Sequence, residues 1–347
     1  MPLPTNPPET DLWLPRPSAG ESWDPHTIHT HYFGLSIPEA EVGVFIYVRA
    51  QPVFGLCSGG VCVFRGLDNR FPLGIEHLDW IVTMPYPEIT GGALTTANGL
   101  RIEFLEPGRV VRLTYASADG ATSLDVTQTA VTPLLVRGHV MPGEDRDTDP
   151  AQQPGGSEQF MHCVGELVVN GERFAVDCHP IRDRSWRQTR SEREIDHPPV
   201  AWSPMRFGDD LMFNQVGFES PDTGPAWKGL FDVPDGAPTF HFGWVWADGE
   251  ARHLTRVRRS VARYHPELFA ALEQEIEAED ETGNVWRFNG RAVAMAHLPS
   301  WANNFFVDAV YRWEDLEGRV THCTYQEAWY RRFHRAMTRA NHVIPTT

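Results

Sequence analysis

Alternation of apolar and polar residues with a period of two dominates the chain. In segments rich in Val, Phe, Tyr and Thr, such alternation predicts β-strands, and Gly-rich and Pro-Gly turn signals separate the segments. The predicted strands of the first half span residues 42–50, 61–66, 100–106, 109–117, 123–131 and 159–169. Those of the second half span residues 210–220, 226–233, 239–249, 251–264, 285–298, 303–315 and 319–332.

About a dozen strands at this spacing indicate barrels or sandwiches. A chain of 347 residues exceeds the size at which one core usually stops growing, so two domains are expected. A charged and then proline-rich stretch follows residue 190, and we therefore predict domains at 1–194 and 195–347. The predicted fold class is all-β, with two antiparallel β-barrel domains packed together and a cleft between them, where small-molecule sites often lie.

Three segments depart from the strand pattern. Residues 265–281 contain good helix formers, but their tail alternates, so both helix and strand stay open. Residues 330–340 predict a short terminal helix. Residues 141–159 combine Pro, Gly and charge and predict a solvated loop.

The net charge is -16 and the isoelectric point is near 5.3, which argues against nucleic acid and anionic membrane surfaces as partners. The proline-rich N-terminus lacks the apolar segment of a secretory signal, and no apolar run approaches the roughly 20 residues of a membrane helix. A cytoplasmic protein without membrane insertion is expected. The sequence leaves its oligomeric state open.

Five cysteines are too few for a disulfide framework in a chain of this length. Three of them adjoin a histidine, but neighbouring strand residues point to opposite faces, and no paired ligand spacing occurs. No metal site is therefore predicted. Nucleotide-binding glycine motifs and the Gly-x-Ser-x-Gly elbow are absent as well, so we expect no organic cofactor.

The strongest local signal follows a hairpin whose Asn170-Gly171 pair predicts a type I′ turn. Beyond its second arm, Arg182 and Arg184 share one strand face, and Asp183 lies on the other. Asp183 is expected to stay ionised between the two arginines. Trp186 supplies a rigid apolar wall. The cluster predicts either the polar floor of an apolar pocket or an ion network that pins one barrel to the next.

Three further residues are candidates for proton transfer. Glu158 and His162 differ by four and share a strand face, and the hairpin register places His162 opposite His179. A histidine pair beside a carboxylate would titrate near neutral pH. The alternative is that each histidine caps a barrel edge or bonds a backbone carbonyl.

Aromatic residues are abundant, with 12 Trp and 19 Phe. Trp244, Trp246 and His241 lie on one predicted strand, and Asn214 lies on another. We assign these four residues to substrate binding. The competing interpretation is that the rings fill a barrel core. As pocket walls, they would suit a polycyclic or isoprenoid ligand and stabilise a developing carbocation.

Residues 157–186 resemble the AttH and carotenoid 1,2-hydratase (CrtC-like) family of double lipocalin-like proteins. The resemblance is carried by Glu158-Gln159, Gly165, Asn170-Gly171, Arg182-Asp183, Ser185 and Trp186. It implies two lipocalin-like barrels with an apolar cavity near their interface. The family's histidine after the aspartate is Arg184 here, and its glycine after the tryptophan is Arg187. Since arginine is no general acid near neutral pH, the family reaction does not transfer directly.

We therefore predict a cofactor-independent lyase, hydratase or isomerase for a terpenoid, steroid or aromatic substrate. Asp183, Glu158, His162 and His179 would handle protons. Arg184 would fix a polar group, and Trp186 would line the cavity. A non-catalytic carrier of lipophilic molecules and a purely structural partner protein are the alternatives.

Overall fold

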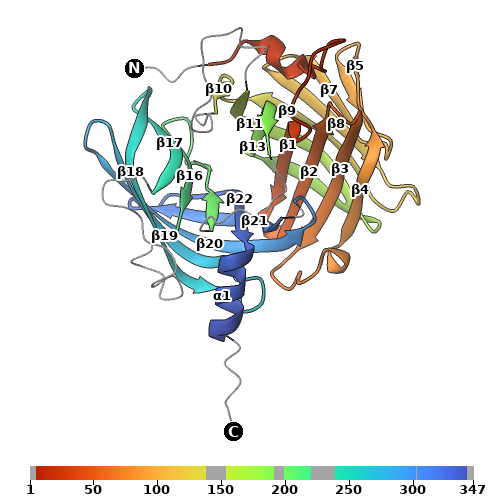
Figure 1. The fold of residues 1–347 in the computed structure, drawn as a ribbon. Helices are drawn as coiled ribbons and strands as arrows, with labels where there is room; N and C mark the ends of the chain where they lie inside the picture. The colour runs from red at the N-terminus through yellow and green to blue at the C-terminus, as the bar shows by residue number, and fades with distance from the viewer. Residues whose placement is uncertain (1–4, 138–153, 191–198, 220–238, 302, 342–347) are drawn as a thin grey trace. The chain divides into compact units, whose positions relative to one another are not determined.

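The computed structural model describes residues 5–137, 154–190, 199–219, 239–301 and 303–341. Figure 1 traces the chain and labels most of its strands. β-Strands make up nearly all of the regular structure in these ranges, and the α-helix α1 (Arg331–Asn341) ends the described chain. The predicted all-β class and the predicted terminal helix are confirmed.

The chain forms two compact units. The N-terminal unit comprises Leu3–Arg65 and Ile75–Ser191, and the C-terminal unit comprises Gly66–Gly74 and Glu192–Thr347. Within the C-terminal unit, Asn69 Nδ2 donates to the carbonyl of Met295 at 2.9 Å, which ties the short Gly66–Gly74 excursion to strand β20 (Val285–Leu298). The domain limits 1–194 and 195–347 stay a prediction.

The N-terminal unit is an open, half-barrel sheet. Its long path runs β4-β3-β2-β1-β13-β11-β9-β8-β7-β6-β5, and β10 and β12 also pair with β11. Its concave face holds a core of aliphatic and aromatic residues that includes Phe33, Ile46 and Val61. The strands are β1 (Thr27–Ile37), β2 (Val42–Gln51), β3 (Leu56–Arg65), β4 (His77–Pro85), β5 (Ile89–Thr90), β6 (Ala93–Thr95), β7 (Arg101–Glu106), β8 (Val110–Ala116), β9 (Ser123–Ala130), β10 (Leu135–Val136), β11 (Gly155–Val169), β12 (Glu172–Cys178) and β13 (Ile181–Thr189).

The C-terminal unit contains a closed barrel of eight strands, because β14 pairs with both β16 and β22. Alternate residues such as Phe213, Val245 and Ile276 fill its interior. Besides β20, the strands of the C-terminal unit are β14 (Val200–Trp202), β15 (Met205–Arg206), β16 (Leu211–Phe218), β17 (Phe240–Ala247), β18 (Glu250–Tyr264), β19 (Ala271–Asp280), β21 (Asn304–Asp315) and β22 (Val320–Tyr330). No helix of the described residues is long and apolar enough to cross a membrane.

The remaining four local predictions have different outcomes. The hairpin turn is confirmed, since Asn170 and Gly171 have positive φ values of 50° and 83°, as a type I′ turn requires. Within the segment 265–281, Ala271–Asp280 form strand β19 rather than a helix, because their alternation lets apolar residues face the barrel core. Residues 141–153 of the predicted loop lie outside the described residues, and the prediction is wrong at its end, where residues 155–159 begin β11. The predicted strand 226–233 lies outside the described residues.

Candidate active site

Strand β13 presents different chemistry on its two faces. Arg182 lies opposite the core residue Phe33 of β1, whereas Asp183 lies opposite Tyr32. Arg182 and Arg184 therefore point to the concave, core-lined side of the sheet and Asp183 to its outer side, as the alternation of the sequence predicts.

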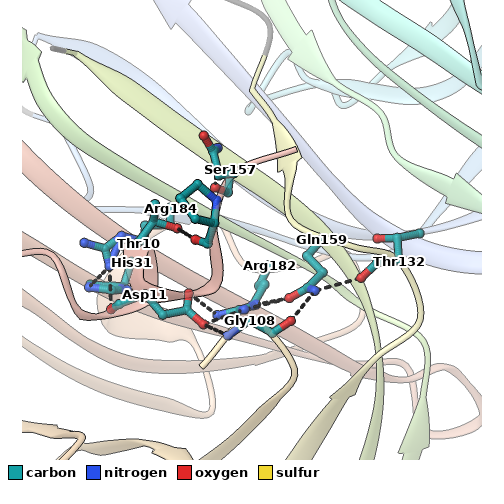
Figure 2. A network of polar contacts seen from close by, with 11 residues as sticks. Thr10, Asp11, His31, Gly108, Thr132, Ser157, Gln159, Arg182 and Arg184 are labelled. Carbon is teal, nitrogen blue, oxygen red and sulfur yellow. Dashed lines mark hydrogen bonds and ion pairs between the residues drawn. The ribbon is translucent and has the colours of Figure 1, made fainter. Parts of the chain in front are cut away.

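On the concave face, Asp11 and Arg182 form a buried ion pair (Figure 2). The nitrogens Nη1 and Nη2 of Arg182 donate to the two carboxylate oxygens at 2.9 Å each. Gln159 accepts from Nε and Nη2 of the same guanidinium at 2.8 and 2.6 Å. Asp11 also accepts the backbone N–H of Gly108 at 2.6 Å. The network thereby joins a short 3-10 helix, Pro8–Leu12, to the sheet.

Arg184 extends this network, but its donors are engaged by the backbone. It donates to the carbonyl oxygens of Asp11, at 2.6 Å, and of Trp13. Its Nε has no hydrogen-bond partner. Burial lowers the pKa of Arg184 to about 9, so it stays a cation at neutral pH. Burial and the charge of Arg184 hold the pKa of the neighbouring His31 well below its usual value.

Trp186 continues the concave face of β13. Its ring makes an edge-on contact with Trp13, with ring centroids 5.4 Å apart. It lies across Gly155, where an added Cβ would approach the indole to 2.5 Å. The ion network is therefore internal to the N-terminal unit, where it fixes the segment that contains Asp11 and Trp13. This finding corrects the alternative that it pins one barrel to another.

On the outer face, a row of side chains crosses four neighbouring strands. Glu158 of β11 is paired with Asp183, Asp183 with Tyr32 of β1, and Tyr32 with Tyr47 of β2. Directly paired residues place their Cβ atoms about 5 Å apart on the same face. Glu158 and the two tyrosines are at most 8% exposed, and the Asp183 side chain is 12% exposed. We call Glu158, Asp183, Tyr32 and Tyr47 the carboxyl row.

Asp183 is the central ionisable group of the carboxyl row. Burial raises its pKa, and the positive charges of Arg137 and Arg190 counteract this effect only in part. Nη1 of Arg137 lies 3.2 Å from Oδ1 and 3.0 Å from Oδ2, but Oδ2 accepts no hydrogen bond. The expectation that Arg182 and Arg184 keep Asp183 ionised is therefore wrong, because both arginines lie on the opposite face and Arg182 pairs with Asp11.

Aromatic rings border the carboxyl row. Phe45 packs against Tyr32 and Tyr47, with ring centroids 5.3 and 5.4 Å apart. Trp80 of β4 stacks on Tyr47 at 6.2 Å across Gly60, which separates the two in the sheet. On the other side of the row, the hydroxyl groups of Thr30 and Ser185 are 2.6 Å apart. A buried carboxyl thus lies between an aromatic surface and a polar one.

The predicted histidine pair forms, but apart from the carboxyl row. The rings of His162 and His179 stack with centroids 4.7 Å apart. His162 is 44% exposed at its side chain and bonds the exposed carboxylate of Asp177 at 2.8 Å. His162 lies four residues beyond Glu158, roughly 13 Å along the strand. The structure thus confirms the register and separates the histidines from Asp183.

The aromatic candidates of the C-terminal unit lie on β16 and β17. Asn214 is paired with Trp244 across these strands, and both are buried. The Oδ1 atom of Asn214 accepts the indole N–H of Trp202 at 2.9 Å. Trp246 is half-buried, and His241 is exposed and contacts Phe218 edge-on at 4.8 Å. Their assignment to substrate binding stays a prediction.

Ligand sets for a metal are not found in the part of the chain that the structure describes, where no three His, Cys, Asp or Glu side chains converge. All five cysteines are buried thiols. Cys163 and Cys178 are paired directly across β11 and β12. The chemistry available in the carboxyl row is proton transfer by carboxyl and phenol groups.

These features define an all-β fold that is consistent with two lipocalin-like barrels, and the resemblance in the sequence is confirmed at the level of the fold. The chain belongs to the DUF7064 family, whose model is described as a domain of unknown function and matches residues 17–331.

Solved structures with this fold include a candidate AttH protein from Nitrosomonas europaea. It is 12% identical over 92% of this chain and 100% of its own, with a TM-score of 0.53. Kievitone hydratase from Nectria haematococca is 11% identical over 94% of each chain, with a TM-score of 0.51. At such identities the likeness shows the fold alone. No curated protein sequence matches the chain.

Proposed function

We propose that the protein is a cofactor-independent hydratase or lyase for an apolar terpenoid, steroid or aromatic molecule, with Asp183 as the proton carrier. One observation supports this role above all: Asp183 is a buried carboxyl with a raised pKa and an oxygen that accepts no hydrogen bond. A carboxyl of this kind stays protonated at a higher pH than a surface aspartate and can act as a general acid. A hydratase is known with this fold.

Water addition to a carbon–carbon double bond needs two proton transfers and no redox cofactor. In the eliminating direction, protonated Asp183 would give its proton to the hydroxyl of the substrate, and water would leave with the electrons of the C–O bond. The carboxylate of Glu158, the cross-strand neighbour of Asp183, would take a proton from the adjacent carbon, whose electron pair forms the double bond. The reverse sequence adds water to the double bond. Isomerisation would use the same donor and acceptor without the water.

The aromatic border of the carboxyl row suits such a substrate. Tyr32, Phe45, Tyr47 and Trp80 offer apolar surface and π faces, which attract a developing positive charge. The proposal therefore rests on Asp183 and Glu158. It omits His162 and His179, whose rings stack elsewhere, and Arg184, whose donors bond backbone carbonyls.

A carrier of lipophilic molecules is the second candidate, and the buried polar network on the concave face of the N-terminal sheet favours it. Asp11, Arg182 and Gln159 satisfy one another, as expected of groups with a static role. The carrier hypothesis expects the ligand to leave the protein unchanged. It assigns no chemistry to Asp183.

Mass spectrometry of purified protein incubated with a lipid and terpenoid extract separates the two functions. We expect a product shifted by the mass of water, and its loss in Asp183→Asn, which keeps the shape of the side chain. Asp177→Asn is the matched control, because Asp177 is an exposed carboxylate of the same unit. Ligands retained without a mass change by wild type and both variants would contradict catalysis and favour the carrier.

A further inference from the structure

Two buried polar atoms in the carboxyl row region lack hydrogen bonds and belong to side chains in contact. They are Nε of Arg137 and Oδ2 of Asp183. Arg137 reaches Asp183 only through Nη1, which lies 3.0 Å from Oδ2. Buried polar groups are nearly always paired, so this donor and this acceptor could each form a hydrogen bond with a bound polar group.

The backbone holds Arg137 firmly in this position. Its N–H donates to the carbonyl of Gly156 at 2.9 Å. Its aliphatic stem crosses Gly156, where an added Cβ would lie 3.1 Å from Cδ and 3.2 Å from Cβ of Arg137. The arginine side chain is 15% exposed. A glycine on β11 thus leaves the space through which the guanidinium reaches the outer face.

The pair of atoms matches one kind of ligand group. A hydroxyl or carbonyl oxygen can accept from Nε of Arg137 and from protonated Asp183, and a hydroxyl can also donate to ionised Oδ2. A hydrocarbon satisfies neither atom. A carboxylate would meet the negative charge of ionised Asp183. Hydroxyl and carbonyl groups therefore fit this position best.

We infer that Arg137 binds an oxygen of the substrate, and that the substrate is an apolar alcohol whose hydroxyl lies at the reacting end. This inference rests on the proposed function. In the eliminating direction, Asp183 gives its proton to the hydroxyl, and the C–O bond breaks with its electrons on oxygen. Glu158 takes the proton from the adjacent carbon, whose electron pair forms the double bond. The released water accepts from Arg137 Nε.

Equilibrium dialysis with matched probes tests this assignment. The probes are farnesol against farnesene and 2-naphthol against naphthalene, each an alcohol and its hydrocarbon counterpart. Wild type is expected to favour the alcohol roughly tenfold or more, the effect of a hydrogen bond to a charged group. Arg137→Gln removes the guanidinium and should abolish the preference. Arg101→Gln, at an exposed arginine of the same unit, should leave it unchanged.

Equal preference in wild type and Arg137→Gln overturns the inference, as does a wild type that binds both members of each pair equally or binds no probe. If Arg137→Gln does not fold, as judged by circular dichroism, Arg137→Lys is used, because it keeps the charge and lacks Nε. Failure of the proposed function has a different signature. Wild type would then keep the alcohol preference that Arg137→Gln loses, but form no product from any extract.

Discussion

The ion pair between Asp11 and Arg182 allows a direct test of how much a buried ion pair contributes to the stability of the fold. Asp11→Ala removes the two carboxylate acceptors of the guanidinium and the acceptor of the Gly108 N–H, while Gln159 still accepts two of the arginine's hydrogen bonds. The side chains of Asp11 and Arg182 are 1% and 4% exposed. Water therefore cannot replace the lost carboxylate without opening the unit.

Removal of one member of a buried ion pair costs about 3–5 kcal/mol, because the remaining charge is left in a medium of low polarity. The unpaired Gly108 N–H adds to this loss. For a unit of this size, 1 kcal/mol corresponds to about 2–4 °C in melting temperature. The expected fall for Asp11→Ala is therefore roughly 6–20 °C.

Differential scanning calorimetry of Asp11→Ala and Asp125→Ala makes the comparison. Asp125 is the matched control: it also accepts two bonds from one arginine, Arg112, at 2.9 and 2.7 Å in the same unit, but the two side chains are 57% and 44% exposed. An exposed pair contributes about 0–1 kcal/mol. Equal losses in the two variants would refute the argument from burial. Replacing both partners, as in Asp11→Leu with Arg182→Met, should recover part of the loss, because no unpaired charge remains.

Three further predictions follow from local geometry. Gly155→Ala should lower the free energy of unfolding in urea by about 1–3 kcal/mol, because the new methyl group would clash with the indole of Trp186. At Gly74 an added methyl group points into open space, so Gly74→Ala should change this free energy by no more than about 0.5 kcal/mol. Equal effects of the two substitutions would contradict the clash. Burial lowers the pKa of His29 from 6.5 to about 3, so its neutral form stabilises the fold above pH 6.5, and this contribution falls as the pH drops toward 3. His29→Asn should therefore lose less unfolding free energy than wild type between pH 6.5 and pH 3. An equal loss in the two proteins would contradict the assignment. Mild oxidation with glutathione disulfide should link Cys163 to Cys178, since directly paired strand residues have Cα separations compatible with a disulfide. Peptide mapping that finds another cysteine pair oxidised first would contradict this prediction.

Much of the fold can be predicted from the sequence, because alternation with a period of two is a local signal. Strand β1 is not predicted by this alternation. Its N-terminal half contains Thr27, His29, Thr30 and His31, whose polar side chains mask a strand that is buried on both faces. The polar residues are buried through partners that are distant in the sequence, and His29 accepts the backbone N–H of Arg187.

The candidate site can be predicted only in part, because the sequence signals are local and several site residues come from distant segments. A turn fixes the register of its hairpin, so the pairing of His162 with His179 follows from local sequence. The same register, continued past Pro180, pairs Glu158 with Asp183, and this pairing could have been predicted from the sequence. The residues that the sequence analysis missed are Asp11, Tyr32, Tyr47 and Arg137, which approach β13 from remote segments without a local motif.

The alternation of β13 explains how a departure from the AttH and CrtC-like motif is compatible with the proposed chemistry. Arg184 stands where that motif has a histidine, on the concave face, and backbone carbonyls of the segment that contains Asp11 accept from two of its nitrogens. Asp183 lies on the other face, where Oδ2 has no hydrogen-bond partner. A change at residue 184 therefore alters the network that anchors the N-terminal segment and leaves the cross-strand pairing of the carboxyl row intact. Stability and the proposed proton transfer thus depend on opposite faces of one strand, and substitutions on the two faces should separate them.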